Sequence, residues 1–412
     1  MTKIITTALI YFTIAFTSVV AADLDKINKE FYKVETDNYS IATTVSKKFA
    51  YRIADHMEEI HKEYRRRLSN IFGEEDVEKF RVVVFDKQSN YLRALGDKVR
   101  GTAGIFMSNE QLLAGFVGKR PPSALFKTLY HEGFHQFLFH YIGPNCPIWL
   151  NEGLAQYFSE ATWTGNGYRV GDIPPHRIYT LKREWENKQW MSLEKLLSLT
   201  NSEWMGMVED QSPRSSLIYN QTWLFVHFLI DGANGKYRDN LEEYLEDIAD
   251  DEDSYEAFTD HFSANFTALR NTLYKYLNTL EPSPKFMCMK NMGIISRLLK
   301  FFIEKGGADI DTLENIEDVH ELFVNSGWKM QMKDGTTLTN RKEDAIEALF
   351  HCPLDKSDKE KSYKFRVHKD SGLPQITCPQ HPGQARIISR FFNNKKTGTL
   401  DFTISEQLPT KH

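Results

Sequence analysis

The segment from Thr128 to Glu160, TLYHEGFHQFLFHYIGPNCPIWLNEGLAQYFSE, constrains this chain more than any other stretch. Within it, His131 and His135 stand four residues apart, and Glu132 directly follows the first histidine. The surrounding apolar residues and the glycine-proline break that ends the run are typical of a helix. The spacing therefore predicts a helix on which both imidazoles share one face, about one turn apart.

This arrangement of two histidines and a glutamate is typical of a catalytic zinc site. Two neutral imidazoles can take two positions of a tetrahedral Zn²⁺ ion. Glu132 projects beside them, where a carboxylate acts as general base toward a water that the metal activates. The H-E-x-x-H pattern carries this chemistry. A surface helix with scattered histidines is the alternative interpretation.

A catalytic zinc ion needs a third protein ligand and an open fourth position. Glu152 is the candidate, with sixteen residues between it and His135. The break at Gly143-Pro144 predicts an antiparallel helical hairpin that returns Glu152 to the metal. His140 and Cys146 are the competing ligands, but His140 belongs to the first helix and Cys146 lies in the turn.

The segment WLNEGLAQYF, which contains Glu152, resembles the segment that carries the glutamate ligand in gluzincin metallopeptidases. The region from about 80 to 280 is similar to DUF1570, a gluzincin-like bacterial family of the MA clan. The similar pieces are RVVVFD, TAGIF, YHEGFHQFL, WLNEGLAQYF and YNQTWLFVHFLI. By position, the resemblance implies a zinc peptidase in which Glu132 is the base and the metal ligands are His131, His135 and Glu152.

Two further residues are expected to support the site. The resemblance implies that Tyr219, at the start of a downstream helix, stabilises the oxyanion; packing in an aromatic core is the alternative for this side chain. Asn151 is expected to orient its helix or Glu152. Residues 104–111, GIFMSNEQ, stand where the gluzincin aminopeptidases have Gly-x-Met-Glu-Asn, and their order differs from it.

The N-terminal residues 1–22, MTKIITTALIYFTIAFTSVVAA, have the order of a secretory signal peptide: one lysine, an apolar run and a small-residue exit. An uncleaved anchor is the alternative. No later run is long and apolar enough to span a bilayer. We therefore expect a secreted or periplasmic protein with no membrane span after signal cleavage. The net charge of -5 gives no electrostatic reason to bind nucleic acid.

The distribution of patterns predicts an α+β protein. Residues 23–120 mix helical periodicity with short strands such as FRVVVF, and form a small α/β part of the peptidase unit. Residues 121–281 are predicted to be mainly helical and to carry the zinc site. The stretch EPSPK, residues 281–285, is a linker candidate because its prolines cannot continue a helix. Residues 286–412 are predicted to form a small mixed accessory domain.

The C-terminal part contains Cys352 and Cys378, each directly before a proline. In an oxidising compartment these two are predicted to form a disulfide. A second metal site built from His351, Cys352, Cys378 and His381 is the alternative. The Cys-x-x-Asn helix and the Cys-Pro-x-Asp and Cys-Pro-x-His pieces resemble pilin-like and pseudopilin-like exported proteins. We expect this domain to bind a surface partner.

These features together predict an exported, zinc-dependent peptidase that hydrolyses amide bonds in a peptide or protein substrate. The alternative is a catalytically inactive gluzincin-like metal-binding protein that acts in recognition or attachment at the cell surface. Glu132 argues against the alternative, because a zinc site used only for binding has no need of a base.

Overall fold

The computed structural model describes residues 30–68, 78–120, 122–163, 168–208, 213–331, 337–341, 343–353, 363–378, 386–394 and 398–407. The predicted signal peptide lies outside these ranges. The chain divides into two compact units. Unit 1 holds the described parts of 1–162, 168–172 and 180–280, and unit 2 holds those of 163–167, 173–179 and 281–412. Both units combine helices with sheets, so the predicted α+β class is confirmed.

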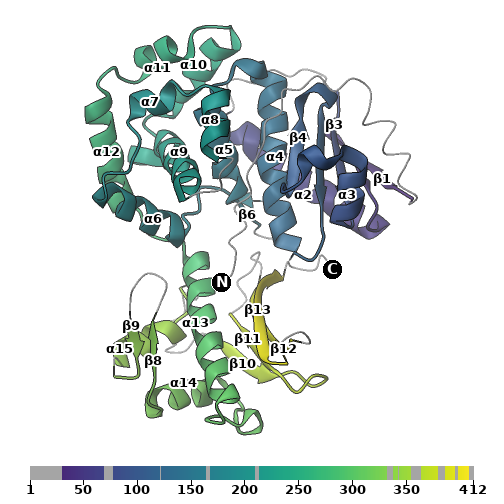
Figure 1. The fold of residues 1–412 in the computed structure, drawn as a ribbon, viewed down its shortest axis with the longest axis vertical. Helices are drawn as coiled ribbons and strands as arrows, with labels where there is room; N and C mark the ends of the chain where they lie inside the picture. Colours follow the sequence, from purple (N-terminus) through teal and green to yellow (C-terminus); the bar gives the residue numbers. More distant parts are fainter. Residues whose placement is uncertain are drawn as a thin grey trace. The chain divides into compact units, whose positions relative to one another are not determined.

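Unit 1 is built on a five-stranded sheet of order β1-β2-β3-β5-β4 (Figure 1). The central strands β2, β3 and β5 are parallel, and the edge strands β1 and β4 run antiparallel to their neighbours. The β-branched run FRVVVF forms β3, as predicted, and buries both of its faces. The strands are β1 (Tyr32–Glu35), β2 (Tyr39–Thr43), β3 (Phe80–Phe85), β4 (Gly104–Met107) and β5 (Leu112–Phe116).

Helices cover both faces of this sheet. The helix α3 (Gln88–Leu95) packs on a cluster that includes Val83 and Phe85 of β3. The helices α2 (Lys47–Arg67) and α4 (Pro122–Ile142) pack against the strands on the other side and against each other. Alternate residues of the strands point to opposite faces, which is why one sheet supports both layers.

A mainly helical part follows, and it contacts the sheet layer through α4 (Figure 1). The helix α5 (Ile148–Ser159) packs between α4 and α9 (Pro213–Asp231), with the ring of Trp149 5.2 Å from that of Phe225. The remaining α-helices before α13 are α6 (Pro175–Glu186), α7 (Leu193–Leu197), α8 (Asn201–Val208), α10 (Arg238–Ala249), α11 (Ser254–His261) and α12 (Phe266–Thr279), and two short strands between α5 and α6 are β6 (Thr162–Trp163) and β7 (Tyr168–Arg169). The division between the units falls inside α6 and β6.

Unit 2 packs helices against an antiparallel sheet of order β10-β11-β12-β13. Its longest helix, α13 (Pro284–Glu304), begins inside the predicted 281–285 linker, because proline is tolerated in the first turn of a helix. The other elements are α14 (Ile316–Asn325), α15 (Glu343–Phe350), β8 (Lys329–Gln331), β9 (Thr337–Thr339), β10 (Lys364–Val367), β11 (Pro374–Thr377), β12 (Arg386–Asn393) and β13 (Leu400–Gln407).

The sequence predicts no membrane span after signal cleavage, and the helices of the structure can be compared with this prediction. In the part of the chain that the structure describes, no helix combines the length and the apolar character that crossing a membrane requires.

Candidate metal centre

The hairpin of α4 and α5 places the predicted ligands on facing helices. The helix α4 ends at Ile142, and Gly143 follows with φ of 80°, a left-handed conformation that glycine adopts without strain. A single 3₁₀ turn (Gly143–Asn145) leads to Pro147, which caps the start of α5. The chain therefore reverses within a few residues, as the glycine-proline break predicts.

This reversal brings His131, His135 and Glu152 together. Their ligand atoms all lie within 4.8 Å of one another. The Nε2 atoms of the two histidines are 3.0 Å apart, and Oε2 of Glu152 lies 3.5 Å from that of His131 and 3.9 Å from that of His135. At most 4% of each of these three residues is exposed. Two nitrogens and one carboxylate thus converge on one buried point.

Asn151 fixes the orientation of one ligand. Nδ1 of His135 lies 2.6 Å from Oδ1 of Asn151. An imidazole that donates its Nδ1 proton to this oxygen leaves Nε2 with a lone pair, and Nε2 is the atom that faces Glu152. Asn151 was expected to orient its own helix or Glu152, and it instead orients a histidine on the neighbouring helix.

The side chain of Glu132 reaches the sheet, and it lies near enough to Glu152 to be affected by its charge. The backbone N–H of Phe106, in the edge strand β4, donates to Oε2 of Glu132 at 3.0 Å. This N–H therefore points away from β5. Oε1 of Glu132 is buried and has no hydrogen-bond partner among the described residues. The backbone thus holds Oε2 of Glu132 in place, and Oε1 is available to accept a proton.

Two glycines let the elements of the site approach closely. A Cβ on Gly153 would lie 2.6 Å from Cγ2 of Val226 and 3.0 Å from the carbonyl oxygen of Thr222, so the residue after Glu152 must be small for α5 to pack on α9. A Cβ on Gly104 would lie 2.7 Å from Cγ2 of Thr128, so glycine also brings β4 against α4. The glycines of NEG and TAGIF are therefore packing requirements of this site.

Burial dominates the electrostatics of the site. It raises the pKa of Glu132 well above its usual value, and repulsion from Glu152 adds to this while the Phe106 N–H opposes it. Burial also raises the pKa of Glu152 to about 7, against the attraction of His135. The pKa of His135 falls to about 4, because burial disfavours the imidazolium. A cation would stabilise this set, because it would favour the ionised form of the two carboxyl groups and the neutral form of the His135 imidazole.

The donor set fits a divalent metal ion. Both oxygens of the Glu152 carboxylate are buried without a hydrogen-bond partner among the described residues. A buried polar group in this condition is costly unless something else satisfies it. Two imidazole nitrogens and a carboxylate oxygen are ligands that Zn²⁺ takes, with one position left open. His131, His135 and Glu152 would hold the ion.

The competing ligands lie apart from this group of three. Among the described residues, the metal-ligand group at the hairpin consists of His131, His135 and Glu152. The ring of His140 packs edge-on against Phe80 at 5.4 Å. Cys146 is buried in the turn, with its thiol donating to a backbone carbonyl.

Tyr219 is buried in α9 and packs edge-on against Trp204, with ring centroids 5.2 Å apart. This contact accounts for its burial as part of the aromatic core between α8 and α9. A role for Tyr219 at the oxyanion stays a prediction.

The predicted Cys352–Cys378 disulfide is not formed, and this expectation is wrong in the structure. No disulfide bond joins any of the four cysteines. Cys352 instead lies next to Cys288, and their Sγ atoms are 3.4 Å apart. The sequence analysis did not pair these two residues. Of the alternative set, His351 is exposed and His381 lies outside the described residues.

Part of the chain matches a known protein family. Residues 126–251 match the model of DUF1570, a family described as proteins of unknown function. The matched region includes the α4–α5 hairpin with all three candidate ligands and Glu132, and it extends through α9. No curated protein matches the chain.

Proposed function

We propose that this protein is an exported, zinc-dependent peptidase that hydrolyses amide bonds in peptides or proteins. The observation that carries the proposal is the convergence of the ligand atoms of His131, His135 and Glu152 within 4.8 Å. Glu132 directly follows His131, and repulsion from Glu152 contributes to the rise of its pKa. Export rests on the signal-like sequence of residues 1–22. The resemblance of the NEGLAQYF segment to gluzincin metallopeptidases supports the same reaction class.

In the proposed hydrolysis, Glu132 and Asn151 have different roles. Zinc in such a site supplies a Lewis acid that polarises a carbonyl and lowers the pKa of water. Oε2 of Glu132 is held by the Phe106 N–H at 3.0 Å, so Oε1 takes the proton of the attacking water and passes it to the leaving amine. Asn151, which contacts Nδ1 of His135, would leave Nε2 of that imidazole available to hold the ion.

The sheet offers a place for an extended substrate. Strand β4 is an edge of the five-stranded sheet, and its Phe106 N–H faces Glu132. Edge strands bind extended peptides by strand addition, although the Phe106 N–H itself is already occupied by Glu132. A peptide that pairs along β4 would run past the Glu132 carboxylate.

One observation favours a second candidate, a metal-binding protein without turnover. His131, Glu132, His135 and Glu152 are each at most 4% exposed. Such burial suits a site that holds a metal ion without admitting a large substrate. The presence of Glu132 favours the peptidase over this candidate, because a site that only binds metal has no need of a base.

Cleavage of a mixed peptide library by zinc-loaded protein tests the proposal. Wild type is expected to cut peptides, and Glu132→Gln is expected to bind zinc but to lose cleavage by at least the ~10²–10⁴-fold that general base catalysis contributes. Glu160→Gln is the matched control, because Glu160 is also a buried glutamate but pairs with Lys127. Zinc binding with every peptide left intact by wild type would support the second candidate.

A further inference from the structure

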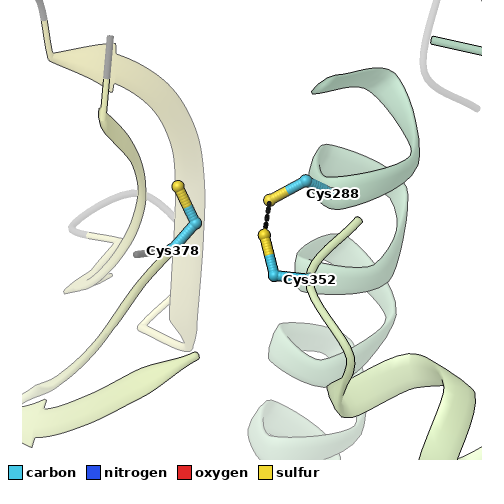
Figure 2. A group of neighbouring side chains, drawn as sticks. All are labelled: Cys288, Cys352 and Cys378. Carbon is cyan, nitrogen blue, oxygen red and sulfur yellow. Dashed lines mark hydrogen bonds between the residues drawn. The ribbon is translucent and has the colours of Figure 1, made fainter. Parts of the chain in front are cut away.

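Unit 2 contains a second cluster of metal-ligating side chains, separate from the hairpin site. The Sγ atoms of Cys288, Cys352 and Cys378 all lie within 4.8 Å of one another (Figure 2). Each of the three residues is at most 2% exposed. Three thiols that meet in a hydrophobic core are soft donors with no access to solvent.

The three thiols come from elements that are far apart in the sequence. Cys288 lies in the first turns of α13, Cys352 lies just after α15, and Cys378 directly follows β11 (Figure 2). Cys352 lies sixty-four positions after Cys288 along the chain. A ligand shared by the trio would cross-link two helices and the sheet.

Polar contacts around the trio hold its members in place. Asn291, one turn after Cys288, donates from Nδ2 to the carbonyl oxygens of Ala348 at 3.1 Å and His351 at 3.3 Å, which fixes the chain that carries Cys352. The backbone N–H of Ile387 donates to Sγ of Cys378 at 3.4 Å. Hydrogen bonds of this kind stabilise a thiolate ligand. The thiols are therefore positioned by the fold rather than brought together by chance in a mobile loop.

The spacing of the sulfurs suits a common metal ion better than it suits a bond between two of them. Two thiolates on one tetrahedral zinc ion lie about 3.8 Å apart, given Zn–S bonds of about 2.3 Å. The Sγ atoms of Cys288 and Cys352 are 3.4 Å apart, and the third thiol is within 4.8 Å of both. A disulfide would use two of the thiols and leave the third buried beside it without a role.

We propose that Cys288, Cys352 and Cys378 bind a structural Zn²⁺ ion that stabilises unit 2. Thiolate donors select Zn²⁺ and Cu⁺ among the common metal ions. Zn²⁺ cancels more of the negative charge of three buried thiolates than Cu⁺ does. Because net charge is costly to bury in a core, this favours Zn²⁺. The three sulfurs supply three of the four positions of a tetrahedral site.

Metal analysis of the full chain tests this site separately from the hairpin site. Wild type and Cys288→Ser are purified without added metal and their zinc content is measured by mass spectrometry. Cys288→Ser is expected to contain one zinc equivalent per chain less than wild type, whereas Cys146→Ser, which removes a buried free thiol outside the trio, keeps the wild-type content. Equal zinc in Cys288→Ser and wild type would overturn the proposal.

Cobalt substitution distinguishes the two sites by their ligands. Co²⁺ bound to thiolates gives a near-ultraviolet charge-transfer band, which imidazole and carboxylate ligands do not produce. This band is expected in wild type and in His131→Ala, and is expected to be absent in Cys352→Ser. Loss of the band in His131→Ala, or its absence from wild type, would contradict a thiolate site in unit 2.

Two measurements on wild type avoid the risk that a variant fails to fold. A strong chelator is expected to lower the melting temperature of unit 2, because a metal that binds only the folded state stabilises it. Alkylation in denaturant without reductant is expected to modify four thiols per chain, because no disulfide joins the four cysteines. Two free thiols and no chelator effect would show a disulfide instead and overturn the metal site.

Discussion

Oδ1 of Asn151 lies 2.6 Å from Nδ1 of His135, and this contact joins the two helices that carry the candidate ligands. It links the NEG segment of α5 to the HEGFH segment of α4 through side chains rather than through the metal alone. The orientation of one imidazole is thus set before any ion binds.

Asn151→Ala removes the acceptor of His135 and is expected to lower zinc affinity by about 10–100-fold, the usual cost of losing a partner of a metal-bound histidine. A chelator-competition titration measures this affinity. Asn151→Asp is the matched control, because its carboxylate keeps an acceptor at the same place. Equal affinities of wild type and Asn151→Ala would show that His135 is oriented by other contacts.

Gly153→Ala is expected to destabilise unit 1 by about 1–3 kcal/mol, as overpacking of a core does. The new Cβ would lie 2.6 Å from Val226 and 3.0 Å from the Thr222 carbonyl oxygen, and α5 must move off α9 to accommodate it. Gly206→Ala in the exposed part of α8 is the control; nothing lies within 4 Å of its Cβ. That change is expected to stabilise by roughly 0.5–1 kcal/mol. Urea unfolding compares the two, and similar effects would contradict the close approach of α5 to α9.

Glu132→Gln is expected to raise the melting temperature of chelator-treated protein at pH 7. Burial and repulsion from Glu152 raise the pKa of Glu132, so its ionisation costs folded-state stability as the pH rises above the unfolded value of about 4.5. A neutral amide of the same shape removes that cost. A lower melting temperature for Glu132→Gln at pH 7 would show that the anchored carboxylate stabilises the metal-free fold.

His61 is expected to make unit 1 sensitive to acid. It is 2% exposed on α2, and burial lowers its pKa to about 4. As the pH falls from the unfolded value of about 6.5 toward 4, the unfolded chain gains a proton that the folded chain does not, so the folded state loses stability. The loss between pH 7 and pH 4.5 is about 2–3 kcal/mol.

His61→Gln cannot titrate, and its free energy of unfolding should fall less than that of wild type over the same pH interval. Denaturant unfolding at pH 7 and pH 4.5 gives both differences. Parallel pH dependence in the two proteins would show that other groups cause the acid sensitivity.

The histidine pair and Glu152 were within reach of sequence reasoning, because helical periodicity and a glycine-proline break are local signals. Spacing places His131 and His135 on one face, and a short antiparallel hairpin leaves Glu152 few other places to go. The strand β3 was equally readable, since its β-branched run is short and bounded. These features depend on contacts between segments that are close in the sequence.

The contacts that position Glu132 could not be predicted from the sequence. The donor is the backbone N–H of Phe106, which carries no residue-type signal, and it reaches Glu132 only because Gly104 lets β4 approach α4. Asn151 was assigned to the wrong target for the same reason. Which side chain it meets depends on the rotation of α5 against α4, and sequence spacing does not determine that rotation.

The cysteine pairing failed for a related reason. Two cysteines before prolines suggested a disulfide, but Cys288, which lies sixty-four positions before Cys352, is the neighbour that packing supplies. The packing of α13 against the end of α15 brings Cys288 and Cys352 together. This contact joins segments that are far apart in the sequence. Asn291, in the Cys-x-x-Asn helix, donates a hydrogen bond to the carbonyl oxygen of Ala348 and so connects α13 to α15.

The most direct test of the account is the zinc content of wild type beside that of Glu152→Ala, both measured by mass spectrometry on the full chain. We predict that Glu152→Ala contains one zinc equivalent less than wild type and that the Glu160→Ala control contains the same amount. The Cys288→Ser variant separates this equivalent from the one expected in unit 2. If wild type and Glu152→Ala hold the same zinc, the hairpin of α4 and α5 is not a metal site and the peptidase proposal is wrong.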